Sequence, residues 1–117
     1  MTIKVGEKGQ PFRIATGFDM SGSTALSIVF TAPTNGTSFT VTQATSPAVT
    51  APAVALTNDP GFTPAQSVAA STYFEYTTSG TEFDIAGTWT ACAVYTDASV
   101  ILNANKVTFT IGAECSV

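Results

Sequence analysis

The clearest alternation of apolar and polar positions in the chain begins at its single tryptophan, Trp89. In an extended chain, Ala91, Ala93 and Tyr95 share the face of Trp89, and the residues between them share the opposite face. This period of two predicts a long strand whose Trp89 face lies in the core. Because Cys92 lies an odd number of residues after Trp89, we expect its thiol to point away from the core.

The residues directly before this strand, Asp84 to Thr88, combine a carboxylate suited to a turn with the flexible Gly87. A tryptophan that follows a glycine by two residues at the start of a strand resembles the corner of immunoglobulin-like sandwiches. At that corner the ring packs between the sheets and its polar edge bonds nearby backbone. Antibody-type domains place an inward-facing cysteine two residues after the ring. The position of Cys92 departs from this spacing, so an intersheet disulfide is not expected.

The first part of the chain predicts a strand, a turn and then a hairpin. Alternating apolar residues indicate the strands, and Asp, Ser, Asn and Gly indicate the turns. Asn-Gly is the dipeptide that best tolerates the left-handed backbone of a tight hairpin. The expected segments are a strand over Pro11–Phe18, a turn over Asp19–Ser23, a strand with Leu26, Ile28 and Phe30 on its apolar face, a turn over Pro33–Gly36, and a returning strand with Phe39 and Val41.

The middle of the chain carries weaker signals. Ala44 to Ala55 is rich in Ala, Pro and Thr, and its prolines lack a backbone donor, so it predicts an extended edge or a linker. A turn is expected over Asn58–Gly61. Thr63-Pro64-Ala65-Gln66 has the form of a capping box with proline at the first helical position, which predicts a short helix ending near Ala70.

Two further strands are expected in the second half. The first has Tyr73, Glu75 and Thr77 on one face and Phe74, Tyr76 and Thr78 on the other, so both faces carry aromatic residues, and a Ser79-Gly80 turn follows it. The second has Val107, Phe109 and Ile111 on one face. Since a short turn over Asp97–Ser99 precedes it, we expect it to lie beside the Trp89 strand.

Together these segments predict a single all-β domain over residues 1–117. The expected fold is an immunoglobulin-like antiparallel β-sandwich of about seven strands with one short helix. A small closed barrel is the alternative. The length of 117 residues suffices for a core without disulfides or metal ions.

The low content of charged residues changes the picture of the surface. Charged residues make up only 10% of the chain, compared with about a quarter in typical soluble domains. A solitary protein usually keeps dispersed charge on its surface. We therefore expect neighbouring molecules to cover much of this surface, as in a symmetric homo-oligomer.

The net charge of -4 argues against nucleic acid as a partner, because binding to phosphates depends on clustered cations. Lys4, Lys8, Arg13 and Lys106 are few and scattered. Met1 to Gln10 lacks the apolar core of a secretory signal, and no apolar run approaches the about 18 residues of a membrane helix. No membrane partner is expected, and Cys92 and Cys115 are expected to be free thiols.

The chain offers little catalytic chemistry. It contains no histidine, the commonest general base and zinc ligand, and no Gly-x-Ser-x-Gly motif. Glu82 and Asp84 could form the carboxylate pair of a glycosidase, but acids beside a glycine turn more often cap backbone amides. We therefore expect no enzyme activity, no catalytic residues and no cofactor.

Two other patterns have a functional and a structural interpretation. Asn58, Asp59 and Asp97 could gather around calcium, but they lack the dense spacing of an oxygen cage and are better explained as turn residues, so no metal ligands are assigned. Asn35-Gly36-Thr37 matches a glycosylation sequon, for which the hairpin turn is a sufficient explanation.

The phenylalanines could form a sugar-binding platform or pack in the core, and core packing is expected for most of them. They are Phe12, Phe18, Phe30, Phe39, Phe62, Phe74, Phe83 and Phe109. Phe62 and Phe83 fall in turns, which makes them candidates for contact with another chain.

Two segments resemble small immunoglobulin-like virion proteins of tailed bacteriophages, such as the N-terminal domains of baseplate upper proteins. Thr16 to Phe30, followed by Pro33 and Asn35-Gly36-Thr37, is similar to their pattern of Asp-Leu-Ser, small residues, an alternating strand and Pro-Asp-Gly-Thr. Tyr73 to Tyr95, with its Asp-x-x-Gly-x-Trp core, is similar to the later half of those domains. The Ala/Pro-rich middle and the Cys115 tail depart from the pattern.

This resemblance implies a non-enzymatic structural subunit, present in several symmetric copies in the tail, baseplate or neck of a virion assembled in the host cytoplasm. Its partners would be other virion proteins. Capsid decoration (a cement protein) is one alternative. A carbohydrate-binding or adhesive β-sandwich module at a cell surface is another.

Overall fold

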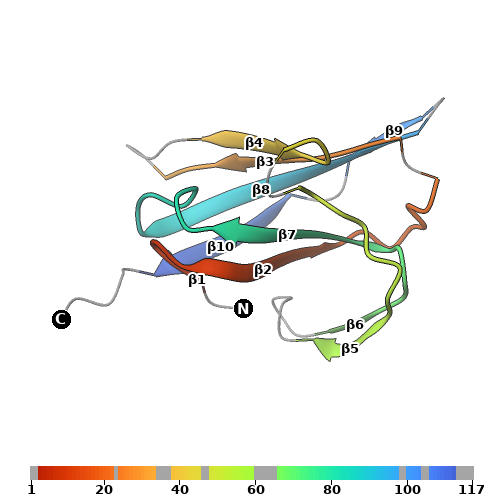
Figure 1. Cartoon of the computed structure of the whole chain (residues 1–117), viewed down its shortest axis with the longest axis horizontal. Helices are drawn as coiled ribbons and strands as arrows, with labels where there is room; N and C mark the ends of the chain where they lie inside the picture. The colour runs from red at the N-terminus through yellow and green to blue at the C-terminus, as the bar shows by residue number, and fades with distance from the viewer. Residues whose placement is uncertain are drawn as a thin grey trace.

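Two layers of β-strands enclose one core of aromatic and aliphatic side chains (Figure 1). The computed structural model describes residues 3–22, 24–33, 38–45, 48–59, 66–97, 100–103 and 106–112. In chain order the strands are β1 (Ile3–Lys4), β2 (Lys8–Ala15), β3 (Ala25–Thr31), β4 (Phe39–Thr42), β5 (Leu56–Asp59), β6 (Gln66–Val68), β7 (Tyr73–Ser79), β8 (Gly87–Thr96), β9 (Ile101–Asn103) and β10 (Val107–Gly112). The protein is therefore all-β over the residues described.

The larger sheet has the strand order β1-β10-β8-β3-β4, and β9 pairs with the far end of β8. Its pairs are antiparallel except for β1 with β10. Trp89, Ala91, Ala93 and Tyr95 all lie in the core, which confirms the inward face predicted for β8. Phe109 pairs with Trp89, so β10 lies beside β8 as expected.

The second layer is the antiparallel pair β2 and β7, which covers the inner face of the larger sheet. Phe12 of β2 joins the two layers, because its ring centroid lies 5.2 Å from that of Phe30 in β3 and 4.6 Å from that of Phe109 in β10. Burial of these rings supplies most of the free energy that holds such layers together. The arrangement is sandwich-like, in agreement with the predicted fold class.

The outer side of β2 and β7 is covered as well. The β5–β6 hairpin lies away from β3 and β4 (Figure 1). In the Ala/Pro-rich segment, Thr50 exchanges two backbone hydrogen bonds with Glu75 of β7, at 3.0 and 2.8 Å. Tyr73 is only 1% exposed on this side, whereas Phe74 is buried on the other. The predicted extended segment and the aromatic residues on both faces of β7 are thus confirmed.

The corner before β8 follows the sequence expectation. The Trp89 Nε1–H donates a hydrogen bond to the Ile85 carbonyl at 3.0 Å, so the ring is buried while its polar edge is satisfied. Gly87 has a φ of 140°, and a Cβ at this position would lie 3.0 Å from Cγ of Pro33. Both the backbone conformation and the close approach of Pro33 require glycine here.

The predicted short helix is wrong. Gln66 to Val68 form β6, which pairs with β5, and residues 63–65 lie outside the described part. A helix of one or two turns gains few internal hydrogen bonds for its cost of nucleation. In the hairpin, the Asn58 N–H instead donates to Ser67 Oγ at 2.9 Å. A turn was also predicted over Asn58–Gly61, but Asn58 and Asp59 end β5, and residues 60 and 61 lie outside the described part.

Other boundaries differ from those predicted. The first long strand covers Lys8–Ala15 rather than Pro11–Phe18, and β1 precedes it. A strand that was not predicted, β9, lies between the Asp97 turn and β10. The described residues contain ten strands, whereas about seven were predicted. β3 and β4 pair as the expected hairpin, but its turn and sequon, at residues 34–37, lie outside the described part. Within the residues described, no helix is long and apolar enough to cross a membrane.

Candidate interaction surface

The outer face of the larger sheet is built from the alternate residues of its strands. Ala91 and Ala93 of β8 point into the core, so Thr90 and Cys92 point outward between them. Residues directly opposite one another on antiparallel strands share a face, so the register extends this surface across the sheet. Its residues are Ala25, Ser27, Val29, Thr31, Thr40, Thr42, Thr88, Thr90, Cys92, Val94, Thr96, Ile101, Asn103, Thr108 and Thr110. We call this surface the Thr-rich face.

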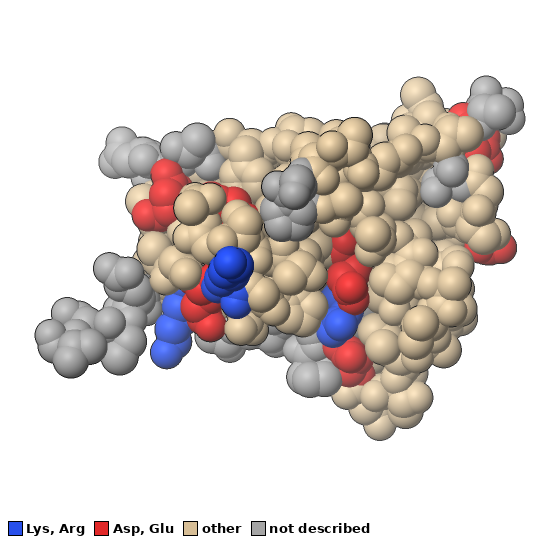
Figure 2. Space-filling view, in the orientation of Figure 1, with Lys and Arg blue, Asp and Glu red and all other residues tan. Residues whose placement is uncertain are grey.

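The Thr-rich face carries no charged residue. Threonine rows cross it, as at Thr31, Thr90 and Thr108, which the register places side by side. Two exposed lysines adjoin it: Lys106 lies between β9 and β10, directly before Val107, and Lys4 lies on β1 at the edge of the sheet. On the side of the molecule seen in Figure 2, acidic and basic side chains form a few separate groups with uncharged surface between them.

Apolar side chains lie in the middle of the Thr-rich face and at one end. Val29 is 39% exposed although it belongs to a strand paired on both sides, and it lies directly opposite Cys92. Val94 is the next outward residue along β8. Ile101, 69% exposed, continues the face on β9 at the far end of the molecule (Figure 1). Exposed apolar side chains that gather in this way are typical of interaction sites.

The sequence interpretation missed the β9 part of this surface. Val100 and Leu102 are exposed beside Ile101. The signal was the short Val-Ile-Leu run after Asp97, but a run of three residues is too short to show alternation.

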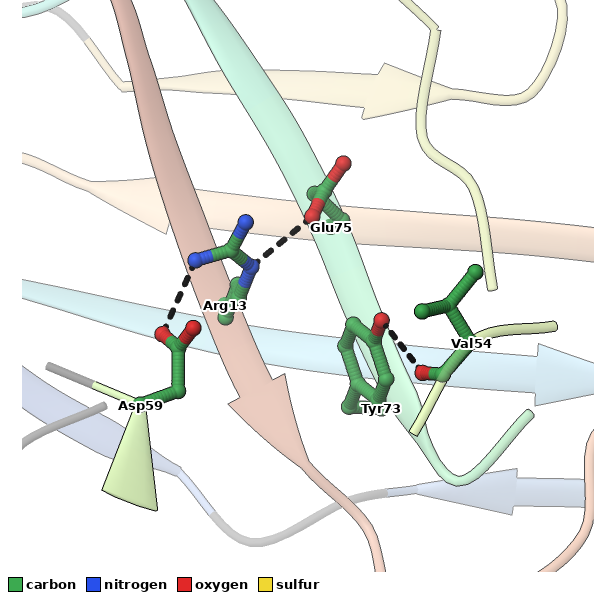
Figure 3. A network of polar contacts seen from close by, with 5 residues as sticks. All are labelled: Arg13, Val54, Asp59, Tyr73 and Glu75. Atoms are coloured by element: carbon green, nitrogen blue, oxygen red, sulfur yellow. Dashed lines mark hydrogen bonds and ion pairs between the residues drawn. The ribbon is translucent and has the colours of Figure 1, made fainter. Parts of the chain in front are cut away.

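Asp59, considered above as a calcium ligand, forms an ion pair instead (Figure 3). Arg13 of β2 donates from Nη1 to Asp59 Oδ1 at 2.9 Å and from Nε to Glu75 Oε2 at 2.8 Å. Close by, the Tyr73 hydroxyl donates to the Val54 carbonyl at 2.9 Å. These contacts attach the β5–β6 hairpin and the preceding segment to the second layer.

Replacing Arg13 with alanine should loosen this attachment. Charge-assisted hydrogen bonds in a partly buried site stabilise by about 1–2 kcal/mol, and the Arg13 side chain is 18% exposed. We expect faster amide hydrogen exchange in β5 and β6 and little change in β8. Lys8→Ala removes an exposed cation from the same strand and serves as the control. Unchanged exchange in β5 and β6 would contradict the structural role of the ion pair.

Glu82 caps the Ser79-Gly80 turn. Its carboxylate accepts hydrogen bonds from the Ser79 N–H at 2.9 Å, the Gly80 N–H at 3.0 Å and the Tyr76 hydroxyl at 2.7 Å. Burial by itself would raise the pKa of Glu82, but these bonds outweigh it, so the pKa lies below its ordinary value. A glycosidase acid needs a raised pKa. The arrangement therefore favours the capping interpretation, and Asp84 is exposed.

The proposed calcium ligands are held by different elements. Asp97 accepts hydrogen bonds from the Val100 N–H at 3.0 Å and the Tyr95 hydroxyl at 3.2 Å in the β8–β9 turn. Asn58 and Asp59 end β5. Across the described ranges, no three His, Cys, Asp or Glu side chains gather where they could hold a metal ion.

The assignment of Phe83 to contact with another chain is wrong. Its side chain is 3% exposed and packs in the core, with ring centroids 5.1 Å from Trp89 and 5.3 Å from Phe30. The connection between β7 and β8 folds this ring back under the larger sheet. Phe62 and Cys115 lie outside the described residues, and Cys92 is a partly buried free thiol, as expected.

The other described phenylalanines agree with the prediction of core packing. Phe12, Phe30, Phe74 and Phe109 are buried, and Phe18 and Phe39 are half-buried against the core. The exposed large apolar side chains of the described part are aliphatic.

Comparisons with protein-family models, with curated proteins and with solved structures found no match for this chain. The fold defines the class as an all-β, sandwich-like protein. Proposals about its function depend on the sequence resemblance and on the Thr-rich face.

Proposed function

We propose that this protein is a non-enzymatic structural subunit of a tailed-bacteriophage virion, present in several symmetric copies in the tail, baseplate or neck. Its partners are other virion proteins, including copies of itself, and its location is the virion assembled in the host cytoplasm. Neither nucleic acid nor membrane is a partner in this proposal.

The observation that carries the proposal is the Thr-rich face. Its strand residues on β3, β4, β8, β9 and β10 are uncharged, with one exposed lysine, Lys106, between β9 and β10, and it exposes Val29 and Ile101 to solvent. The free energy of desolvation is small when such a surface is buried against another protein, because its strands present hydroxyl and apolar groups rather than ionised ones. A subunit that is always covered in an assembly can keep this surface, whereas a solitary protein would be prone to association.

The corner at Trp89 supports an immunoglobulin-like topology as part of the proposal. The buried ring, its bond to the Ile85 carbonyl and the glycine at Gly87 are the features shared with the family that the sequence resembles. The other resembling segment, Thr16 to Phe30, ends in β3, whose Leu26, Ile28 and Phe30 face inward beside β8. The Trp89 strand and β3 are thus neighbours in the larger sheet, whereas Tyr73 to Ser79 form β7 of the second layer.

Particles from the phage that encodes this chain provide the test. Mass spectrometry of purified virions should find its peptides at several copies per particle, and imaging should place its density in the tail, baseplate or neck. Its gene should lie among genes for portal, sheath or tail-tube proteins. Density on the capsid surface would favour the decoration alternative. Absence from particles, together with glycan-array binding by the purified protein, would contradict the proposal and favour the adhesive module.

A further inference from the structure

We propose that one edge of the larger sheet binds an extended segment of another virion protein as an added β-strand, and that this segment carries a carboxylate opposite Lys106. The edge consists of β9, Lys106 and residues 107–109 of β10, and we call it the open edge. The inference deepens the proposed function, because it names the kind of partner that the subunit binds.

The open edge lies on the side of β8 away from β3. Since β3 pairs with β8 on one side, β9 and β10 both pair with it on the other. No described strand pairs with the far side of β9, and β1 pairs only with Ile111 and Gly112 of β10. The backbone of the open edge is therefore not covered by any described strand.

The backbone of β9 presents hydrogen-bonding groups to a partner. The Asp97 N–H donates to the Val100 carbonyl at 2.9 Å, so the backbone of Val100 faces β8. Backbone groups point to alternate sides along a strand, so those of Leu102 also face β8. The N–H and C=O groups of Ile101 and Asn103 therefore point away from β8.

The same alternation holds in β10. The Gly112 carbonyl accepts a hydrogen bond from the Val5 N–H at 2.9 Å, so the backbone of Gly112 points away from β8. The N–H and C=O groups of Thr108 point to the same side, beyond the end of β1. An extended segment can therefore form main-chain hydrogen bonds along the open edge, as in β-strand addition.

Three other sheet edges are blocked. At the edge of β4, the Thr42 carbonyl accepts a hydrogen bond from the Val49 N–H at 3.0 Å. At the edge of β7, Thr50 pairs with Glu75. β2 contains Pro11, which has no N–H to donate. Natural sheets prevent unwanted pairing by such devices. β9 contains neither a proline nor a charge, so it is available for pairing.

Apolar side chains on β9 define part of the chemistry of the partner. Ile101 is 69% exposed and Leu102 is 40% exposed. Successive residues of a strand lie on opposite faces, so these two side chains flank an added strand on both of its faces. A segment with apolar or β-branched side chains on each face would cover both of them.

Lys106 defines the charge of the partner. It is exposed and directly precedes β10. The ion pairs among the described residues are those of Arg13, so none of these residues pairs with Lys106. β9 separates Lys106 from Asp97, and the three residues of β9 span about 10 Å. This span exceeds the screening distance of about 8 Å at physiological ionic strength. A carboxylate on the added strand would supply the missing counter-charge.

The charge also argues against edge-to-edge pairing of two copies. Two open edges paired with each other would bring together two Lys106 side chains and no acid. Like charges across an interface oppose association. We therefore assign the added strand to a different protein.

The test uses the full-length protein and a synthetic peptide with blocked ends. The peptide has nine residues that alternate between threonine and valine, with aspartate in place of the central threonine. In its presence, the Ile101, Asn103 and Thr108 amides should exchange hydrogen at least tenfold more slowly, whereas the Thr40 amide on β4 should not change. A matched peptide with lysine at the centre should bind about tenfold more weakly, because its charge opposes that of Lys106.

Two variants separate charge from backbone pairing. Lys106→Glu should reverse the preference between the two peptides, and Lys8→Glu, at an exposed lysine of β2, should leave it unchanged. Thr108→Pro removes an outward N–H and should abolish binding, whereas Thr40→Pro on the edge strand β4 should not. Circular dichroism checks folding. If Thr108→Pro does not fold, a peptide methylated at its backbone nitrogens replaces it and should not bind.

Three outcomes would overturn the inference: exchange at the open edge that the acidic peptide does not slow, equal affinity for the two peptides, or binding that survives loss of the backbone donors. Slower exchange of the same amides at high protein concentration without peptide would assign the open edge to a second copy and would also overturn it. In each case the presence of the chain in virions still decides the proposed function independently.

Discussion

Replacing Phe83 with alanine is expected to lower the free energy of unfolding by about 3–5 kcal/mol, the usual cost of removing a buried aromatic ring. The ring contacts Trp89, Phe30 and Phe109 with centroid distances of 5.1, 5.3 and 5.7 Å. Its removal loses both buried area and edge-to-face contacts, and it leaves a cavity between the two layers.

Guanidinium unfolding, followed by the fluorescence of Trp89, measures this effect in the same protein. The emission of native Phe83→Ala should shift to longer wavelength, because water or mobile side chains reach the indole. Val54→Ala removes an exposed aliphatic side chain and should change the free energy of unfolding by less than about 0.5 kcal/mol. If Phe83→Ala were as mild as this control, the ring would not be part of the core.

Replacing Glu82 with alanine is expected to destabilise the protein by about 2–3 kcal/mol, because partly buried donors lose a charged acceptor. Tyr76 is 2% exposed, and its hydroxyl donates to Glu82 at 2.7 Å. The Ser79 and Gly80 amides of the turn lose the same acceptor. Chemical denaturation at neutral pH measures the loss, and Asp84→Ala, which removes an exposed neighbouring acid, is the control.

The pH dependence of stability should also identify Glu82. Its pKa in the folded protein is lowered from the ordinary value of 4.5, because hydrogen bonds outweigh the opposing effect of burial. The carboxylate therefore stabilises the fold fully above its unfolded pKa, and this contribution is lost as the pH falls through the folded value. Glu82→Gln should reduce the slope of stability against pH in this acidic range. A slope equal to that of the unchanged protein would assign the acid sensitivity to other carboxylates.

The local sequence pattern was sufficient to predict the central strands and their inward faces. In β3 and β8, every second residue is apolar. These residues therefore form the inner face in any sheet that buries one side. The Trp89 corner was also predictable, because glycine and the turn residues act within a few positions of the ring. In these segments the local preferences and the tertiary contacts agree.

Local pattern failed where a distant partner decides the conformation. The capping signal before Gln66 predicted a helix, but pairing with Leu56 to Asp59 makes this segment a strand. The turn context of Phe83 predicted exposure, but the fold provides a site for the ring between Trp89 and Phe30. In each case a contact between residues far apart outweighs a preference worth only about 1 kcal/mol.

The amino-acid sequence by itself determined the all-β class, the inward faces of the main strands and the shortage of charge, because alternation and composition are properties of the chain alone. Only the tertiary structure decided that the threonines of β3, β4, β8 and β10 lie on one continuous face around Cys92. It also decided that Arg13 joins Asp59 to Glu75. The physical reason is register: hydrogen bonding between strands far apart in the chain places side chains next to one another, and no local pattern specifies those pairs.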